Sequence, residues 1–197
     1  MYLTLLVGPM FAGKSSALLA RVRRAKTLGW PVLLLTSSID KRYSDSGHEI
    51  TTHDKDSLTA VGVQVLKGVV EREDYKVAKL IVIEESQFFP DLYDFVVAAV
   101  EQDKKSVVVV GLDGDSDRRP FGDILRLIPL ADEIIKLTAL CKRCGDGTAA
   151  LFSALLPDVG EKTAQICVGG AERYEPMCRH HFLENQAIRM LRNEGCE

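Results

Sequence analysis

The chain has 197 residues, 46% of them hydrophobic and 27% charged, which is typical of one globular domain with room for a small second module. Its 25 basic and 28 acidic residues leave a net charge of −3, which excludes a global positive field for binding a nucleic-acid backbone. No apolar run is long enough to span a bilayer and no basic segment precedes the apolar N-terminus, so we expect a cytoplasmic protein with neither a membrane nor a nucleic-acid partner.

Apolar runs alternate with helical patterns along the first 135 residues. Four runs predict strands that are buried on both faces of a parallel sheet: Leu3–Val7, Val32–Thr36, Lys79–Ile83 and Ser106–Gly111. Helical patterns cover Lys14–Leu28 and a segment that begins at Pro90 and Asp91. The alternation predicts an α/β fold, namely a P-loop, RecA-like, doubly wound and mostly parallel sheet with ligands beyond the carboxyl ends of its strands.

The remaining segments have a different composition. Residues Ser37–Leu58 are polar and poor in strand patterns, so we expect a loop there. After residue 135, short β runs around Cys141 and Gln165–Val168 alternate with loops, which predicts a small zinc-ribbon-like module. We therefore predict a nucleotide-binding domain over residues 1–135, a zinc-binding module over residues 136–183 and a C-terminal tail, helical or frayed, over residues 184–197.

A phosphate-binding loop occupies residues 8–15, between the first strand and the first helix. Its sequence, Gly8-Pro9-Met10-Phe11-Ala12-Gly13-Lys14-Ser15, matches the pattern G-x4-G-K-[ST] in full. The glycines let the backbone turn so that amides point at phosphate oxygens, and the following helix adds the positive end of its dipole. We expect Lys14 to neutralise the β- and γ-phosphates of ATP and the Ser15 hydroxyl to bind Mg²⁺.

Two adjacent carboxylates, Glu84 and Glu85, follow the apolar run Lys79–Ile83. A P-loop enzyme needs a carboxylate at the end of a neighbouring strand to hold hydrated Mg²⁺. Adjacent residues of a strand point to opposite faces, so we expect the two side chains to have different roles. One serves the metal, and the other faces the acceptor and takes the proton of an attacking hydroxyl.

Four residues near the C-terminus have the spacing of a zinc site. Cys141 and Cys144 form a C-x2-C pair, and Cys178 and His181 form a C-x2-H pair. With all four positions filled by protein, no open position is left for a water nucleophile, so the predicted Zn²⁺ is structural. We expect His180 to lie on the surface or behind the ligands.

These three features, in this order, resemble the type II, zinc-containing thymidine kinases, and the resemblance runs from about Leu3 to His181. Further matching stretches are Asp40-Lys41-Arg42-Tyr43, Thr52-His53-Asp54, Gln87-Phe88-Phe89-Pro90-Asp91, Leu112-Asp113-Gly114, Pro120-Phe121-Gly122, Lys136-Leu137-Thr138-Ala139 and Gly169-Gly170-Ala171-Glu172-Arg173-Tyr174. The resemblance implies phosphorylation of the thymidine 5′-hydroxyl by ATP in nucleotide salvage, with Mg²⁺ and a structural Zn²⁺. It also implies a homotetramer, and a lasso-like loop that the zinc module ties down over the nucleoside.

The same resemblance assigns roles to individual residues. Glu85 falls at the position of the general base, and Glu84 at that of an aspartate associated with Mg²⁺. Asp40 and Arg42 match residues near the phosphates, where an arginine stabilises the transferring phosphoryl group, so Arg42 joins Lys14 and Glu85 as an expected catalytic residue. The ATP and Mg²⁺ site is expected to comprise residues 8–15 with Asp40, Glu84 and Gln87. The nucleoside site is expected to comprise Met10, Phe88, Leu112, Phe121, Ser153, Val168, Gly169, Gly170 and Tyr174.

This sequence departs from the family pattern at three positions. Glu84 replaces the usual aspartate and adds one methylene beside the metal. Ser116 stands where the family carries an aromatic residue against the nucleoside, which removes about 1–3 kcal/mol of stacking and burial. Leu155 replaces an arginine in the lasso-like loop, after a short insertion around residues 145–147. These changes leave a relaxed preference among pyrimidine deoxynucleosides open.

The sequence is also compatible with two other functions. A non-catalytic family member, acting as a subunit or nucleotide sensor, would bind ATP without nucleoside-dependent turnover. A P-loop ATPase with a zinc-ribbon nucleic-acid module would hydrolyse ATP in response to nucleic acid. The acidic balance of the chain and its few interleaved aromatic and basic residues argue against this last function.

Overall fold

The computed structural model describes residues 1–39, 49–51, 57–159, 165 and 169–194 of the chain. Within these residues, six strands form one parallel sheet in the order β5-β2-β6-β7-β1-β8. The strands are β1 (Tyr2–Val7), β2 (Val32–Ser37), β5 (Val61–Val63), β6 (Leu80–Ile83), β7 (Ser106–Gly111) and β8 (Glu133–Lys136). The four predicted strands are confirmed, each within one residue of its predicted ends.

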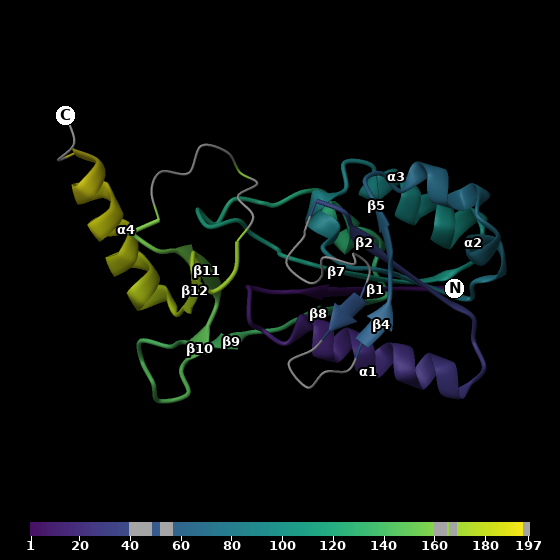
Figure 1. The fold of residues 1–197 in the computed structure, drawn as a ribbon, viewed down its shortest axis with the longest axis horizontal. Coiled ribbons are helices and arrows are strands. Elements are labelled where there is room, and N and C mark those ends of the chain that lie inside the picture. The colour runs from purple at the N-terminus through teal and green to yellow at the C-terminus, as the bar shows by residue number, and fades with distance from the viewer. Residues whose placement is uncertain (40–48, 52–56, 160–164, 166–168, 195–197) are drawn as a thin grey trace.

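Helices cover both faces of this sheet (Figure 1). One face carries α1 (Lys14–Thr27). The other face carries the 3₁₀ helix η1 (Lys67–Glu71), α2 (Glu73–Val77), α3 (Leu92–Val97), the π-helical turn η3 (Ala98–Gln102) and the 3₁₀ helix η4 (Ile124–Leu130). Side chains alternate between the two cores along β1, because Leu3 and Leu5 pack on the second face and Leu6 packs under α1. Both predicted helices, α1 and α3, are confirmed.

The segment predicted as a loop contains two short strands. β3 (Glu49–Thr51) pairs antiparallel with β4 (Ser57–Thr59). The prediction of a loop over Ser37–Leu58 is therefore wrong for these residues. A strand of three residues is too short to leave a periodic pattern in the sequence, so its partner decides its conformation.

Two hairpins and a helix form the C-terminal part of the molecule. β9 (Ala139–Leu140) pairs with β10 (Ala149–Ala150), and β11 (Phe152–Leu155) pairs with β12 (Tyr174–Met177). The helix α4 (Arg179–Glu194) lies beside β11 and β12 (Figure 1), so the expected helical or frayed tail is helical through Glu194. Among the described helices, none combines the length and the apolar character that crossing a membrane requires. The boundaries of the three predicted units stay predictions.

Candidate active site

The phosphate-binding loop runs from Gly8 to Ser15, between β1 and α1. Gly8 has a φ of 150°, and a Cβ placed on it would lie 2.3 Å from the carbonyl oxygen of Leu137. Gly13 has a left-handed φ of 76° and immediately precedes α1. Only glycine meets both requirements without strain. The loop therefore places the N-terminus of α1 at its mouth, an arrangement that binds phosphate.

Lys14 and Ser15 each make side-chain hydrogen bonds at this loop. The Lys14 ammonium donates to the carbonyl oxygens of Gly8 (3.1 Å) and Pro9 (2.7 Å), so the loop folds around the cation. The Ser15 hydroxyl donates to Oε1 of Glu84 at 2.6 Å, and Glu84 is buried. Hydroxyl and carboxylate oxygens are the ligands that Mg²⁺ prefers. Ser15 and Glu84 therefore fit a site for hydrated Mg²⁺.

Glu84 and Glu85 lie just beyond the end of β6 and not on the strand. The prediction that strand geometry separates them is wrong, because β6 ends at Ile83 and Glu85 adopts a left-handed φ of 51°. This turn nevertheless directs the two carboxylates to different partners. Glu84 meets Ser15, whereas Oε2 of Glu85 accepts a hydrogen bond of 2.5 Å from Nε2 of Gln87. A non-glycine residue in this conformation costs about 1–3 kcal/mol, which the surrounding contacts offset.

Gln87 connects Glu85 to the end of β7. Its Oε1 accepts a hydrogen bond of 3.1 Å from the N–H of Leu112, while its Nε2 donates to Glu85. The side chain is buried, and a Cβ on Gly111 would lie 2.7 Å from its Oε1. A larger residue at position 111 would therefore displace the amide. The family resemblance associates Gln87 with ATP and Mg²⁺, whereas in the structure Gln87 is bonded to the expected general base and lines the pocket beside the phosphate-binding loop.

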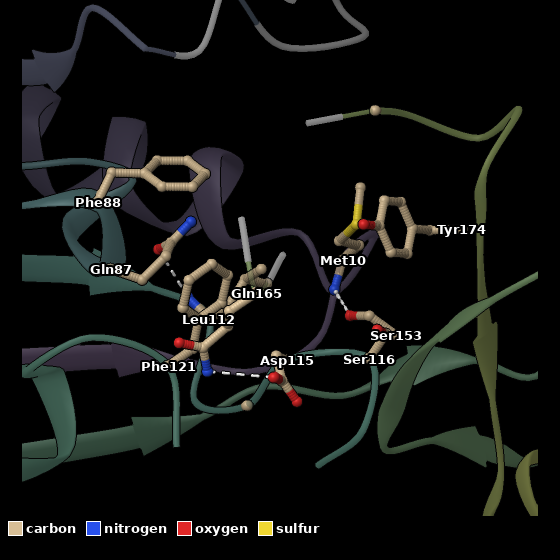
Figure 2. Close-up of a pocket in the computed structure, with 12 residues that line it drawn as sticks. Met10, Gln87, Phe88, Leu112, Asp115, Ser116, Phe121, Ser153, Gln165 and Tyr174 are labelled. Atoms are coloured by element: carbon tan, nitrogen blue, oxygen red, sulfur yellow. Dashed lines mark hydrogen bonds between the residues drawn. The ribbon is translucent and has the colours of Figure 1, made fainter. Parts of the chain in front are cut away.

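A pocket of about 450 Å³, part of it open to solvent, lies next to the phosphate-binding loop (Figure 2). Five of the expected residues form its largely apolar lining: Met10, Phe88, Leu112, Phe121 and Tyr174. The rings of Phe88 and Phe121 meet edge to face, with their centroids 5.7 Å apart. Because Met10 also belongs to the phosphate-binding loop, the pocket and that loop share a wall.

Residues from the C-terminal part close the pocket. Ser153 on β11 lines it, and the Ser153 hydroxyl oxygen accepts a hydrogen bond of 2.9 Å from the N–H of Met10. This bond joins two segments that are 143 residues apart in sequence. Gly169 also lines the pocket, as expected. Gly170 lies outside this lining, and its carbonyl oxygen accepts a hydrogen bond from the N–H of Tyr174 at 3.0 Å.

The polar end of the pocket was not predicted. Asp115 and Gln165 line it, and Oδ2 of Asp115 accepts a hydrogen bond of 3.1 Å from Nε2 of Gln165 (Figure 2). The neighbouring Ser116, singled out only as a family departure, is buried and lines the pocket too. Its hydroxyl has no hydrogen-bond partner among the described residues. The available signal was the position of Asp115 directly after the matching stretch Leu112-Asp113-Gly114.

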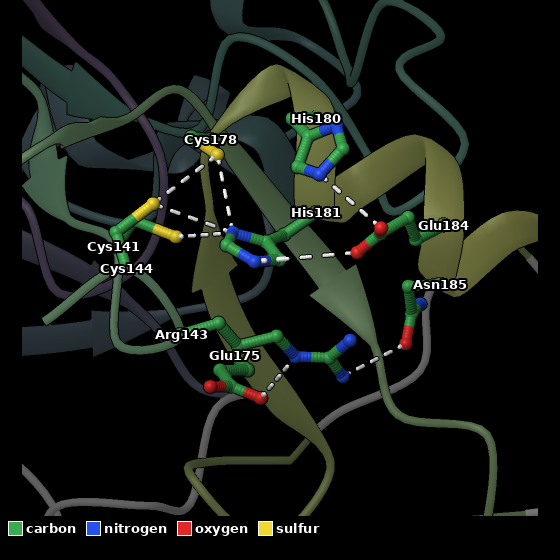
Figure 3. Close-up of polar contacts among 9 residues, drawn as sticks. All are labelled: Cys141, Arg143, Cys144, Glu175, Cys178, His180, His181, Glu184 and Asn185. Carbon is green, nitrogen blue, oxygen red and sulfur yellow. Dashed lines mark hydrogen bonds and ion pairs between the residues drawn. The ribbon is translucent and has the colours of Figure 1, made fainter.

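Cys141, Cys144, Cys178 and His181 come together at the ends of the hairpins and the start of α4 (Figure 3). Each of the three Sγ atoms lies 3.4 Å from Nδ1 of His181, and the Sγ atoms of Cys144 and Cys178 lie 3.8 Å apart. Around a tetrahedral Zn²⁺ with Zn–S near 2.3 Å and Zn–N near 2.0 Å, a sulfur and a nitrogen ligand lie about 3.5 Å apart and two sulfur ligands about 3.8 Å apart. The cluster therefore fits Zn²⁺ closely. His180 is exposed, as expected.

Neighbouring groups act on the ligands of this cluster. The His181 ring turns Nδ1 toward the sulfurs, and its Nε2 lies on the opposite side, 4.0 Å from Oε2 of Glu184 (Figure 3). Burial raises the pKa of the Cys141 thiol, but backbone hydrogen bonds from Cys178 and Cys144 and one from His181 outweigh it and lower that pKa. Burial and the neighbouring Cys141 and Cys178 raise the pKa of the Cys144 thiol. Within this pair, Cys141 is the thiol whose surroundings favour the thiolate, the form that binds metal.

The comparison with known proteins agrees with this geometry. The sequence model of the family described as thymidine kinase matches residues 1–182. The chain is 43% identical to a thymidine kinase of Oryza sativa subsp. japonica over 93% of this chain and 66% of that protein, slightly less than two thirds of its length. It is 39% identical to thymidine kinase a of Arabidopsis thaliana over 93% of this chain and 75% of that protein. It is 38% identical to the thymidine kinase of Monkeypox virus, over 93% and 98% respectively. The chain belongs to the thymidine kinase family.

In this member of the thymidine kinase family, the expected residues that the structure describes gather in two places. The phosphate-binding loop, Glu84, Glu85, Gln87 and the pocket lining meet at the carboxyl edge of the sheet. The Cys and His cluster adjoins them, because Ala12 of the loop packs against its core. The expected residues Asp40, Arg42 and Val168 lie outside the described residues.

Proposed function

We propose that this protein transfers the γ-phosphoryl group of ATP to the 5′-hydroxyl of thymidine, which yields dTMP and ADP. Membership of the family supports the reaction class, and the names of the plant and poxvirus relatives support the substrate. The observation that carries the proposal is Met10, which belongs both to the phosphate-binding loop and to the pocket wall. A triphosphate held by the loop and a nucleoside held by the pocket would therefore meet at this residue.

The donor side of the reaction uses residues that are already close together. Lys14 would exchange its bonds to the carbonyl oxygens of Gly8 and Pro9 for bonds to β- and γ-phosphate oxygens. Ser15 and Glu84 would hold Mg²⁺, which neutralises charge on the phosphates. Asp40 and Arg42 complete this side by family resemblance.

The acceptor side depends on Glu85 and Gln87. Glu85 would accept the proton of the 5′-hydroxyl as the bond from O5′ to Pγ forms and the bond from Pγ to the leaving oxygen of ADP breaks. Gln87 keeps the Glu85 carboxylate in place, because the N–H of Leu112 fixes the other end of its amide. The apolar walls of the pocket would bury the nucleobase of thymidine. Ser116 and Asp115 offer polar groups at one end of the pocket.

The first test measures ADP formation with ATP·Mg²⁺ and a panel of deoxynucleosides, for the wild type and for Glu85→Gln. We expect turnover that depends on thymidine, and a loss of about 10²–10⁴-fold in kcat for Glu85→Gln because the general base is removed. ATP affinity, measured by calorimetry, should change little in the variant. Glu101→Gln, a change on an exposed residue of η3, is the matched control and should keep wild-type rates.

The outcomes separate the competing functions. Near-normal turnover by Glu85→Gln would contradict the assignment of the base. ATP binding without turnover of any nucleoside would favour a non-catalytic family member. The Ser116 hydroxyl, which replaces an aromatic ring, favours including deoxycytidine and deoxyuridine in the panel, because equal rates would establish a relaxed preference. A homotetrameric assembly and a cytoplasmic location stay predictions from the sequence.

A further inference from the structure

Residues 114–121, here named the pocket loop, follow β7. One side of this loop lines the pocket, and the other side contacts α4. The inner side lines the pocket with Gly114, Asp115, Ser116 and Phe121 (Figure 2). The outer side consists of Asp117 and Arg118, which contact the C-terminal helix α4. The loop thus connects the nucleoside pocket to the C-terminal part of the molecule.

Internal hydrogen bonds make the pocket loop rigid. Gly114 and Pro120 form an antiparallel bridge, and the N–H of Asp115 donates to the carbonyl oxygen of Arg119 at 2.9 Å. Oδ1 of Asp115 accepts hydrogen bonds from the N–H groups of Asp117 and Arg119, each at 2.9 Å. Because the loop is cross-linked in this way, a shift of its outer side moves the residues that line the pocket.

One face of α4 holds the outer side of the loop. The guanidinium of Arg118 lies over the ring of Phe182, 4.8 Å from its centroid, and donates to Oε1 of Gln186 at 3.4 Å. Nη1 of Arg189 lies 3.9 Å from Oδ1 of Asp117. The three helix residues are spaced i, i+4 and i+7, so they share one face of α4. Arg118 also adopts a left-handed φ of 65°, uncommon for arginine, while it makes these contacts.

The helix itself is fixed to the strand that closes the pocket. Asn185 is buried, and its Nδ2 donates to the carbonyl oxygen of Leu155 on β11 at 2.9 Å. Arg143, between the first two cysteines, donates to Oδ1 of the same Asn185 at 3.3 Å (Figure 3). The same strand carries Ser153, the residue bonded to Met10. The helix therefore braces the pocket loop from a fixed position.

We propose that α4 is part of the nucleoside site, with Arg118 as a positioning residue that sets the pocket loop for the nucleoside. This inference rests on the proposed function. The family match covers residues 1–182, and the helix residues Gln186 and Arg189, which contact the pocket loop, lie beyond it. We expect these contacts to affect binding of the pyrimidine nucleoside and not of ATP. The reason is that the pocket loop lines the nucleoside pocket and is not part of the phosphate-binding loop.

The test compares Arg118→Ala, Arg118→Lys and the double variant Arg118→Ala/Arg189→Ala with the wild type. Arg192→Ala is the matched control, since Arg192 lies on the same helix and pairs with the exposed Asp158 away from the loop. We expect Arg118→Ala to raise KM for thymidine about two- to fivefold, as loss of an exposed cation–π contact predicts, with KM for ATP unchanged. The double variant should exceed this change, and Arg118→Lys should restore part of it because its charge can still lie over the ring.

Zinc content, thermal stability and thymidine affinity by calorimetry are measured in parallel. An unchanged KM for thymidine in Arg118→Ala would overturn the inference. Equal increases of both KM values, together with lower thermal stability, would also overturn it, because they indicate a general structural role. A wild type that neither binds nor phosphorylates thymidine contradicts the proposed function and this inference together, whereas an active wild type with a normal Arg118→Ala contradicts the inference alone.

Discussion

Gly8 cannot be replaced by a residue with a side chain, because a Cβ at this position would clash with the carbonyl oxygen of Leu137. Gly122 plays the same part on the pocket side, because a Cβ there would lie 2.5 Å from the carbonyl oxygen of Gln87. Both contacts are backbone against backbone, so neither can be relieved by turning a side chain. Two glycines thus let the phosphate-binding loop approach the residue that follows β8 and let the segment after the pocket loop approach Gln87.

The substitution Glu84→Gln tests the proposed Mg²⁺ site. The change keeps the size of the side chain and removes its negative charge beside Ser15. We expect the Mg²⁺ concentration for half-maximal activity to rise about tenfold or more, because a hydrogen bond or ligand contact to a charged group contributes about 1.5–3 kcal/mol. Kinase rates across a magnesium titration measure it. Glu84→Asp, which keeps the charge, should stay closer to the wild type, and an unchanged titration curve for Glu84→Gln would argue against the assignment.

At the scale of elements, the hairpins β9–β10 and β11–β12 are too short to be stable alone. Two small clusters of buried residues support them, one around Cys141 and Cys178 and one around Met177 and Phe182. Cys141 and Cys144 follow β9, and Cys178 and His181 lie at the start of α4. A single Zn²⁺ bound by these four residues would join the two segments and supply the missing stability. These hairpins carry Ser153 and contact the phosphate-binding loop, so their folding reaches the active site.

Removal of zinc is therefore expected to affect both stability and activity. A chelator treatment followed by assay in excess Mg²⁺, or the change Cys178→Ser, should lower Tm by about 5 °C or more. It should also raise KM for thymidine, because Ser153 would no longer be held at the pocket. Zinc content is measured by metal analysis, Tm by calorimetry and KM for thymidine by steady-state kinetics. Re-addition of Zn²⁺ should reverse the effects of the chelator. His180→Ala, next to a ligand but exposed, is the control; a fully active, equally stable zinc-free protein would refute the structural role.

For the whole molecule, stability comes from a parallel sheet covered on both faces. The central strands β6 and β7 are buried along their lengths, and their residues supply both hydrophobic cores. Such a sheet brings the carboxyl ends of its strands to one edge. That edge carries the phosphate-binding loop, the paired carboxylates and the start of the pocket loop.

Ile81→Ala probes this core directly. Ile81 is fully buried in the middle of β6, so the variant should lose about 2–5 kcal/mol of stability through lost burial and the cavity that remains. Tm should fall by about 5–15 °C. Val77→Ala, on an exposed residue at the end of α2, should change stability by less than about 0.5 kcal/mol. Urea or thermal unfolding measures both, and equal effects for the two variants would show that the core contributes less than its burial implies.

The sequence was sufficient for features that neighbouring residues encode. The phosphate-binding loop, the two cysteine-containing ligand pairs and four strands of the sheet follow from short motifs or from continuous apolar runs. The strands β5 and β8 were not predicted. They have only three and four residues, and they lie at the edges of the sheet, where their side chains are only partly buried and the apolar pattern is weak.

Other features depend on how the layers stack, and no local pattern contains them. The bond between Met10 and Ser153 joins residues 143 apart, and the one between Asp115 and Gln165 joins residues 50 apart. The separation of Glu84 from Glu85 arises from a left-handed turn beyond the strand. Polar contacts of this kind act over a few ångströms between distant segments, so their partners are known only once burial of the apolar faces has brought those segments together.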